Sequence, residues 1–322
     1  MRGELIAAID LGTNTARLLI GRVEEGTICR ELVMRSITRL GGGFCRQEGI
    51  AVAAWERSLA AMQEFAAAIK TNGVKQVMAV ATSAVRDAAN GADFCEAVRS
   101  STGIGLEVIS GKREGELTLR GVLSGLDRMP EYLLVFDVGG GSTEYTLARG
   151  GEVLFSKSLP LGVVRLTEGK GSPAAMEEKV DRELLKLMEE MRGAGVLHLA
   201  GGAEMVGTAG TATSLAAISQ QLTDYDYRKI NNHVITLEEI EAIFARLLPL
   251  TPEERLKRIA GLEKGREDLI VAGTILTMRT MSLFGIHRLK VSDFSLLEGV
   301  LMALNDSLGD ECKTVLLRPE SS

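Results

Sequence analysis

The sequence contains two related stretches, AIDLGTNT at residues 8–15 and VFDVGGGSTE at residues 135–144. Each stretch starts with apolar residues typical of a buried strand, reaches an aspartate and continues into glycines and hydroxyl side chains. A second apolar run and a further glycine turn follow both stretches, within residues 16–26 and 145–151. The pattern predicts one β-hairpin that is used twice in the chain.

The turns of both hairpins are suited to phosphate. Glycine lets backbone N–H groups approach an anion closely, while threonine and serine hydroxyls add further donors. A tight turn uses glycine as well, so it is the paired occurrence that favours phosphate binding and predicts a clamp of two facing turns. The residues expected to contact phosphate are Gly12, Thr13, Asn14, Gly139, Gly140, Gly141, Ser142 and Thr143.

Two aspartates, Asp10 and Asp137, end the first strand of each hairpin. An unpaired carboxylate at such a place is costly unless it is exposed at the strand tip or binds a cation. Mg²⁺ binds few carboxylates and completes its coordination with substrate oxygens and water. We therefore expect a Mg²⁺ ion beside the phosphate clamp.

The composition narrows the class of protein. The chain has 322 residues, of which 45% are hydrophobic, and this length corresponds to about two folded domains. A net charge of −6 and an aromatic content of 4% disfavour nucleic acid and anionic lipid as partners. No apolar run reaches the ~18 residues that span a bilayer. The first strand starts by Leu5 without a basic leader, so we expect a cytoplasmic protein that binds neither nucleic acid nor a membrane.

The four cysteines do not suggest a metal site. Cys29, Cys45, Cys95 and Cys312 stand far apart, without a C-x-x-C pair or a nearby histidine. We expect reduced thiols, so the predicted metal site depends on carboxylates.

Strands and helices alternate along the chain, which is typical of α/β domains. Beyond the first hairpin, the pattern predicts strands at residues 77–81, 106–109, 132–138, 144–148 and 152–158. It predicts helices at residues 52–69, 91–101, 114–126, 173–191, 267–284 and 295–308, and two more that start at the capping box of Thr236 and at Pro252. Residues 127–130 are the expected hinge, and the last helix is expected to pack back on the first domain.

Four segments occur in the order and spacing seen in the exopolyphosphatase/guanosine pentaphosphate phosphohydrolase family. They are DLGTNTARLL at residues 10–19, ATSAVRDAAN at 81–90, VISG at 108–111 before Glu114 and Gly115, and DVGGGSTE at 137–144. The similarity continues at residues 158–166, 207–213, 232–233 and 298–301 and covers nearly the whole length. The chain resembles a short member, without the helical C-terminal region of longer relatives.

This resemblance implies an α/β fold of the actin-like ATPase type, as in sugar kinases and heat-shock 70 proteins. Two ribonuclease H-like domains would surround a central cleft. We expect the first domain to comprise residues 1–126 and a C-terminal helix at about 299–322, and the second domain to comprise residues 127–298.

The resemblance also implies roles for individual residues. Glu114 would activate the attacking water, although alone it would be read as a solvated charge at a helix start. Asp137 and Glu144 would stand near Mg²⁺, with Asp10 as the next candidate. The further phosphate contacts implied are Arg17 and Arg86, for which a salt bridge is the alternative, and Gly210 and Thr211, for which helix capping is the alternative. His233 is a weak candidate for the cleft.

Three positions depart from the family pattern. Relatives commonly carry an acidic residue where Arg113 stands and a basic residue where Glu116 stands, and Leu297 replaces a frequent arginine. The first two departures affect the substrate contacts near Glu114 more than Glu114 itself.

The implied activity is Mg²⁺-dependent hydrolysis of the terminal phosphate of inorganic polyphosphate, with guanosine pentaphosphate as an alternative substrate. Two other functions stay open. One is a small-molecule kinase or ATPase on the same fold, and the other is a regulator that binds guanosine tetra- or pentaphosphate without turnover, which the departures at Arg113 and Glu116 make plausible. The family and the helical patterns near the C-terminus favour a homodimer.

Overall fold

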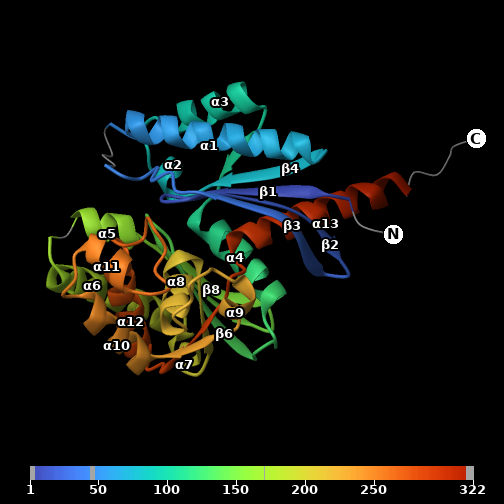
Figure 1. Cartoon of the computed structure of the whole chain (residues 1–322). Helices are drawn as coiled ribbons and strands as arrows, with labels where there is room; N and C mark the ends of the chain where they lie inside the picture. Colours follow the sequence, from blue (N-terminus) through green and yellow to red (C-terminus); the bar gives the residue numbers. More distant parts are fainter. Residues whose placement is uncertain (1–3, 44–47, 170, 317–322) are drawn as a thin grey trace, which may run out of the picture.

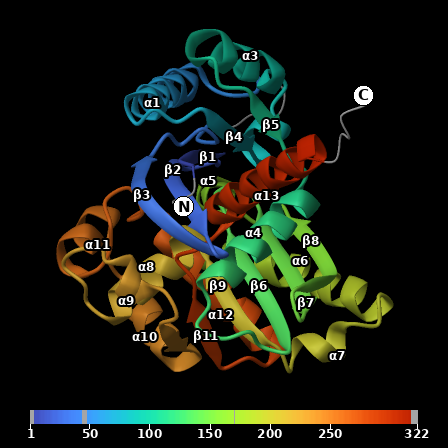
Figure 2. The same cartoon turned by 90° about the vertical axis from the view of Figure 1, so that its right-hand side faces the viewer.

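The computed structural model describes residues 4–43, 48–169 and 171–316, and side-chain burial up to residue 308. Figure 1 shows two α/β lobes, one above the other, with α4 (Gly111–Gly125) and α13 (Leu296–Leu316) near their junction. Figure 2, turned by 90°, shows α4 and α13 side by side between the two sheets. The expected fold class, α/β with two sheets around a central cleft, is confirmed.

The first sheet contains five strands, in the spatial order β3 (Thr27–Ser36), β2 (Ala16–Glu24), β1 (Ile6–Leu11), β4 (Gln76–Ala81) and β5 (Leu106–Val108). β1, β2 and β3 form an antiparallel meander, whereas β1, β4 and β5 are parallel. Helices cover both faces of the parallel part, which explains why β1 and β4 read as nearly continuous apolar runs.

The second sheet repeats this plan with six strands, in the spatial order β10 (Val234–Thr236), β11 (Arg288–Val291), β9 (Glu204–Thr208), β6 (Tyr132–Val138), β7 (Thr143–Arg149) and β8 (Glu152–Leu159). β6, β7 and β8 form a second antiparallel meander, and β6 runs parallel to β9. The hairpin that the sequence predicts twice is therefore present twice.

The other helices cover the outer faces of the two sheets or lie in the connections. Those of the first lobe are α1 (Val52–Thr71), α2 (Ser83–Arg86) and α3 (Gly91–Thr102). Those of the second lobe are α5 (Val163–Gly169), α6 (Pro173–Gly193), α7 (Leu197–Ala200), α8 (Ala209–Ser219), α9 (Tyr227–Ile230), α10 (Leu237–Leu247), α11 (Pro252–Arg258) and α12 (Ile270–Phe284).

Three expectations on local structure differ from the observed elements. Helix α4 begins at Gly111 instead of residue 114, because the Ser110 hydroxyl accepts a hydrogen bond from the Arg113 N–H and caps the helix earlier. α12 begins at Ile270 instead of residue 267. The short strands β10, at the edge of the second sheet, and β11, between β10 and β9, were not expected, and their pairing partners are distant in sequence.

Helix α13 packs back on the first sheet, as the sequence predicts. Its buried residues Val300 and Leu301 contact Ile6 and Ala8 of β1 in one apolar cluster. The domain limits 1–126 with 299–322 and 127–298 stay a prediction, and residues 317–322 lie outside the described residues.

Helix α4 lies between two cores. Its Leu117 belongs to the cluster of α13 and the first sheet, whereas Leu119 and Val122 pack against β6 of the second sheet. α4 and α13 meet at two glycines without side chains between them. A Cβ added to Gly121 would run into the carbonyl of Ser295, and one added to Gly299 would run into the carbonyl of Leu117.

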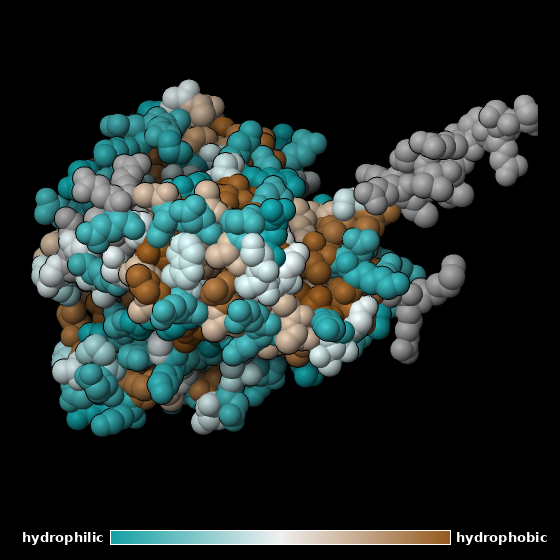
Figure 3. Space-filling view, turned by 90° about the horizontal axis from the view of Figure 1, so that it is seen from above, coloured by the Kyte–Doolittle hydropathy of each residue, from teal (hydrophilic) through white to brown (hydrophobic). Residues whose placement is uncertain are grey.

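The surface is mainly hydrophilic on the face seen in Figure 3, and hydrophobic side chains gather toward the end of the molecule where α13 runs. Within residues 4–43, 48–169 and 171–316, no helix combines the length and apolar character that a membrane crossing needs. Cys29 and Cys95 carry free thiols, whereas Cys45 and the side chain of Cys312 lie outside what the structure describes.

The helix crossing generates a stability prediction. Gly121→Ala forces α4 and α13 apart, and such overpacking is expected to lower the free energy of unfolding by about 1–3 kcal/mol. Chemical denaturation followed by circular dichroism measures the change. The control is Gly193→Ala in α6, where open space surrounds the added methyl group and no loss is expected. Equal stability of both variants would contradict the backbone contact.

Candidate active site

Both predicted aspartates project into the space between the two sheets. Ala8 of β1 packs in the cluster of α13, and Asp10 shares its face because alternate residues of a strand point the same way. Val135 of β6 packs against α4, and Asp137 continues that row. The repeated hairpins therefore aim two carboxylates at one point between the sheets.

A cavity of about 90 Å³ lies at this point. One water molecule needs ~10–15 Å³, so there is room for several waters or for a phosphate group. Most of the predicted site residues line the cavity: Asp10, Gly12, Thr13, Asn14, Arg17, Glu114, Asp137, Gly139, Gly140, Gly141, Ser142 and Gly210.

The two glycine turns face each other across the cavity. Thr13 Oγ1 lies 2.9 Å from Ser83 Oγ. A Cβ on Gly141 would lie only 2.7 Å from Thr13 Oγ1, and a Cβ on Gly140 would lie 3.2 Å from the backbone nitrogen of Asn14. Glycines are therefore required in the second turn for the two turns to approach this closely.

The first glycine of each turn has the same structural use. The N–H of Gly12 donates to the carbonyl of Thr15 at 3.0 Å, and the N–H of Gly139 donates to the carbonyl of Ser142 at 3.0 Å. These two N–H groups close the turns, so Gly12 and Gly139 shape the cavity wall through the backbone. The buried carboxamide oxygen of Asn14 has no hydrogen-bond partner within the described residues, which leaves an unsatisfied polar atom in the wall.

The two aspartates face cross-strand partners of opposite charge. Asp10 faces Arg17 in the β1–β2 register, and its Oδ2 accepts hydrogen bonds from Arg17 Nε at 3.1 Å and from Nη2 at 2.6 Å. Asp137 faces Glu144 in the β6–β7 register, and both carboxylates are buried. The first hairpin thus neutralises its aspartate, whereas the second places two acids side by side.

The acids of the second hairpin are incompletely compensated. Burial raises the pKa of Asp137 to about 6 against the opposing charge of Arg17. Burial, together with the charge of Asp137, raises the pKa of Glu144 to about 7. Hydrogen bonds from Thr118 to Asp137 at 3.2 Å and from Ser158 to Glu144 at 2.6 Å offset this only in part. A divalent cation would supply the missing positive charge.

Glu114 reaches the cavity from the start of α4. Two glycines flank it, and both let the helix lie directly against β7 and β8: a Cβ on Gly111 would lie 3.0 Å from Ser158 Oγ, and one on Gly115 would lie 2.7 Å from Ser156 Oγ. This close packing buries Glu114 to 7% exposure instead of leaving it solvated.

The surroundings of Glu114 favour proton uptake. Burial and the nearby charges of Glu144 and Asp137 raise the pKa of Glu114 well above its ordinary value, while Arg86 opposes the shift. Arg86 Nη1 lies 3.4 Å from Glu114 Oε2 and donates to the carbonyl of Ile109 at 2.8 Å. A carboxylate with a raised pKa is a stronger base than an exposed one.

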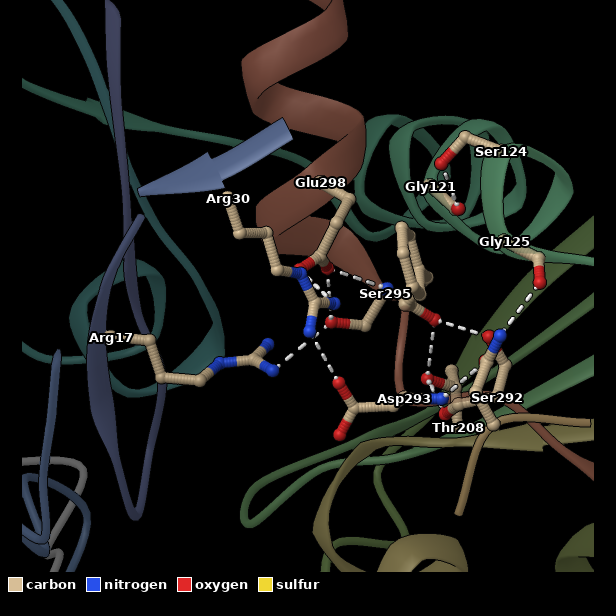
Figure 4. A network of polar contacts seen from close by, with 12 residues as sticks. Arg17, Arg30, Gly121, Ser124, Gly125, Thr208, Ser292, Asp293, Ser295 and Glu298 are labelled. Atoms are coloured by element: carbon tan, nitrogen blue, oxygen red, sulfur yellow. Dashed lines mark hydrogen bonds and ion pairs between the residues drawn. The ribbon is translucent and has the colours of Figure 1, made fainter. Parts of the chain in front are cut away.

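Arg17 is held from two sides. Besides its bonds to Asp10, it donates through Nη1 to Ser295 Oγ at 3.0 Å, just before α13 begins, and Figure 4 shows this second contact. Glu298 accepts from the Ser295 N–H at 2.8 Å and from Arg30 Nη2 at 2.7 Å. Although burial opposes the charge of Arg17, Asp10 and Glu298 keep its pKa raised, so Arg17 is a fixed cation in the cavity wall.

Arg266 is a second cation in the wall, and the sequence analysis missed it. Burial and the charge of Arg35 lower the pKa of Arg266 to about 10, and its Nε has no hydrogen-bond partner within the described residues. Its guanidinium lies directly against Gly210, where an added Cβ would collide with it. The preceding residue, Ala209, has a φ of 61°, a strained conformation of the kind found at functional sites. A buried, unsatisfied donor of this kind suits an anion.

Several predicted residues lie beside the cavity rather than in its wall. Glu144 lies next to Asp137, and Arg86 lies next to Glu114, but neither of the two lines the cavity. The Thr143 hydroxyl donates to the carbonyl of Leu161, and Thr211 packs under Gly273 of α12. His233 Nε2 lies 3.1 Å from Ser219 Oγ and does not line the cavity.

The departures near Glu114 do not reach the cavity. Arg113 Nη1 lies 3.5 Å from Glu116 Oε2, so the exchanged charges pair with each other on the accessible side of α4. Neither side chain lines the cavity, whereas Leu297 lines an adjoining one.

Ser83 and Arg266 are among the wall residues that were not expected. Ser83 stands two residues after the end of the parallel strand β4, and a hydroxyl near such a strand end is a usable signal. Arg266 stands in the connection between α11 and α12, where no local pattern distinguishes it from a solvated arginine.

A metal would depend on few protein ligands. Within the described residues, no group of three or more His, Cys, Asp or Glu side chains is arranged to hold a metal ion. Asp137 and Glu144 are two adjacent buried acids that lack a full counter-charge, while Asp10 is engaged by Arg17. This donor set fits Mg²⁺, which takes one or two carboxylates and completes its shell with phosphate oxygens and water.

Comparison with known proteins agrees with this geometry. The model of the Ppx/GppA phosphatase family matches residues 19–308. Exopolyphosphatase 2 of Mycobacterium tuberculosis is 34% identical over 316 residues, which cover 93% of this chain and 98% of that protein. The bifunctional 3-dehydroquinate synthase/phosphatase of Fusobacterium nucleatum is 30% identical over 92% of this chain, which spans only 46% of that longer protein.

Solved structures agree as well. The Aquifex aeolicus PPX-GPPA enzyme superposes with a TM-score of 0.76 at 33% identity, covering 93% of this chain and 99% of that one. An exopolyphosphatase from Cytophaga hutchinsonii superposes with a TM-score of 0.85 at 28% identity, covering 94% of this chain and 98% of that one. Fold, cavity and sequence lead to one conclusion: the chain belongs to the Ppx/GppA phosphatase family.

Proposed function

We propose that this chain hydrolyses the terminal phosphoanhydride bond of inorganic polyphosphate and releases orthophosphate. The observation that carries the proposal is the buried carboxylate of Glu114 in the wall of a phosphate-sized cavity that two glycine turns enclose. The similarity to Exopolyphosphatase 2 of Mycobacterium tuberculosis over nearly its full length supports the same substrate class.

The wall residues suggest how the terminal phosphate is held. The hydroxyls of Thr13 and Ser83 and the glycine turn at residues 139–141 surround it, and the cations Arg17 and Arg266 offset its charge. Mg²⁺, held by Asp137 and Glu144 with Asp10 nearby, would neutralise phosphoryl oxygens when bound. Preorganised groups of this kind stabilise charge that develops in the transition state.

Glu114 would act as the general base. It accepts a proton from a water molecule as the water oxygen attacks the terminal phosphorus, and the bond to the bridging oxygen breaks. The remaining chain leaves with the electron pair of that bond. Arg86, which does not line the cavity, would help to orient the Glu114 carboxylate.

Guanosine pentaphosphate is a further candidate substrate. A cavity of about 770 Å³ adjoins the phosphate-sized one and offers space for a group larger than phosphate. A kinase or ATPase, or a regulator that binds guanosine tetra- or pentaphosphate without turnover, would use the same cavities. These alternatives differ from the proposal in their products.

We also propose a homodimer, from the family resemblance and from the hydrophobic side chains that gather toward α13 in Figure 3. Sedimentation at several protein concentrations tests it, and a single monomeric species would exclude it.

Activity is expected to depend on Glu114. Glu114→Gln keeps the size of the side chain but removes the base, so Mg²⁺-dependent phosphate release from long-chain polyphosphate should fall at least about 100-fold. Phosphate release is measured for both proteins with polyphosphate, guanosine pentaphosphate and ATP in parallel. Glu116→Gln is the matched control, since this half-buried neighbour lies outside the cavity, and it should keep full activity.

The outcomes separate the candidate functions. Turnover of neither polyphosphate nor guanosine pentaphosphate would overturn the proposal. ATP-dependent transfer would then favour a kinase, and tight guanosine tetraphosphate binding without turnover would favour a regulator. Full activity of Glu114→Gln would remove Glu114 as the base.

The buried acids predict a pH-dependent stability. The pKa of Glu144 is raised from 4.5 to about 7 in the folded protein. The ionised carboxylate of Glu144 is therefore less stable in the native state than in the unfolded chain. Without metal, Glu144→Gln should equal the natural chain near pH 4.5 and become more stable as pH rises through 7. The expected gain above pH 7 is roughly 1–3 kcal/mol. Thermal unfolding in a chelating buffer from pH 4.5 to 8 measures it.

Added Mg²⁺ provides the second arm of this experiment. At pH 8, Mg²⁺ should raise the unfolding temperature of the natural chain more than that of Glu144→Gln. Glu131→Gln, at an exposed acid paired with Arg149, is the control and should respond as the natural chain does. An equal Mg²⁺ response of all three proteins would exclude Glu144 as a ligand.

A further inference from the structure

The cavity of about 770 Å³ adjoins the phosphate-sized one, because both share wall residues. These are Arg17, Ala209, Gly210 and Arg266. A polyphosphate chain whose terminal group lies in the first cavity would continue past Arg17 and Arg266 into the second. The charges along this second cavity therefore meet the next phosphate groups of the chain.

The arginines of the second cavity differ in how fully their charge is satisfied. Arg30 binds two carboxylates, Asp293 Oδ2 at 2.8 Å and Glu298 Oε1 at 2.7 Å. Its guanidinium also lies 4.1 Å from the ring centroid of Phe294 and 4.8 Å from that of Tyr227. The Nε of Arg30 also has no hydrogen-bond partner within the described residues, but two carboxylates match its charge and two aromatic faces hold it, so its role is structural.

Arg35 and Arg266 are in the opposite situation, because they share one carboxylate. Arg35 Nη1 lies 2.8 Å from Glu263 Oε2. Arg266 Nε lies 3.6 Å from the same oxygen, which is too far for a hydrogen bond. Two guanidinium groups thus face a single negative charge, and the donor of the buried one is unsatisfied within the described residues.

Glu263 stands at the rim of the cleft, between the lobes. It belongs to the connection between α11 and α12 of the second lobe, whereas Arg35 lies on β3 of the first. The same connection contacts the first lobe at Gly265, which has a φ of 88° and where a Cβ would run into Ile37. A third cavity, of about 380 Å³, is lined by Glu263 and shares Arg35 with the second.

We propose that Glu263 is an intramolecular substitute for substrate: its carboxylate occupies the anion site of Arg35 and Arg266, and a phosphate group behind the terminal one displaces it. This inference rests on the proposed function. Phosphate and carboxylate present similar oxygens to a guanidinium, and phosphate has more of them to reach both arginines. Glu263 therefore opposes the binding of long chains and releases the lobe contact when they bind.

Removing the negative charge of Glu263 should strengthen binding of the chain. In the natural chain, polyphosphate must break the half-exposed ion pair between Arg35 and Glu263 and approach a negative charge. The variant has neither cost, so its affinity should be about 3- to 10-fold higher. Binding of long-chain polyphosphate is measured by calorimetry at low ionic strength in the Glu114→Gln protein, with and without Glu263→Gln. The Glu114→Gln background prevents hydrolysis, so binding is read without turnover.

The control is Asp268→Asn in the same connection. Asp268 Oδ2 pairs with Arg39 Nη1 at 3.0 Å, again between the lobes, but neither residue lines the first or second cavity. Asp268→Asn should leave the affinity unchanged. Equal strengthening by both variants would mean that a looser contact between the lobes is the cause, and would overturn the substitution by Glu263.

The remaining outcomes are also decisive. Unchanged affinity of Glu263→Gln, with polyphosphate bound by every variant, would overturn this inference and leave the proposed function intact. No polyphosphate binding by any of the proteins would overturn the proposed function and this inference with it. As a further check, Arg35→Gln in the same background should weaken binding several-fold, because it removes half of the anion site.

Discussion

The backbone contact between α4 and α13 is the constraint on which the site depends. α13 packs against the first sheet, and α4 packs against the second. Glycines at 121 and 299 let the backbones of the two helices touch without side chains between them. This contact sets the separation of β1 and β6, and thereby that of Asp10 and Asp137. Both helices also start beside the cavity, where α4 supplies Glu114 and the residue before α13, Ser295, orients Arg17.

The two copies of the hairpin differ in function because they differ at one position, the residue opposite the aspartate. The residue opposite the aspartate is Arg17 in the first copy and Glu144 in the second. The first pair is internally neutral and presents a fixed cation to the cavity. The second pair is a buried double acid whose pKa values are raised, and it is stable in the charged form only beside a cation. The Asp10–Arg17 pair is thus suited to phosphate oxygens and the Asp137–Glu144 pair to a metal.

An acidic protein can bind a polyanion because the positive charges are local. The net charge is −6, yet Arg17 and Arg266 stand in the wall of the cavity, where low polarity strengthens their attraction for phosphate. The difference between these arginines is their partners. Arg17 is fixed by Asp10 and Ser295, whereas the Nε of Arg266 has no hydrogen-bond acceptor within the described residues and Arg266 shares Glu263 with Arg35.

The sequence by itself determined the α/β class, the repeated hairpin and most of the cavity wall, because these depend on short patterns in which neighbours in sequence are neighbours in space. The turn at residues 139–142, between β6 and β7, is an example. Tertiary structure alone decided what depends on distant partners. The strands β10 and β11 form only through pairing with segments that are distant in sequence, the Thr143 hydroxyl donates to the carbonyl of Leu161, and Arg113 and Glu116 pair with each other outside the cavity. Arg266 enters the site because the connection before α12 folds against Gly210, and no local pattern encodes a contact that two remote backbones create.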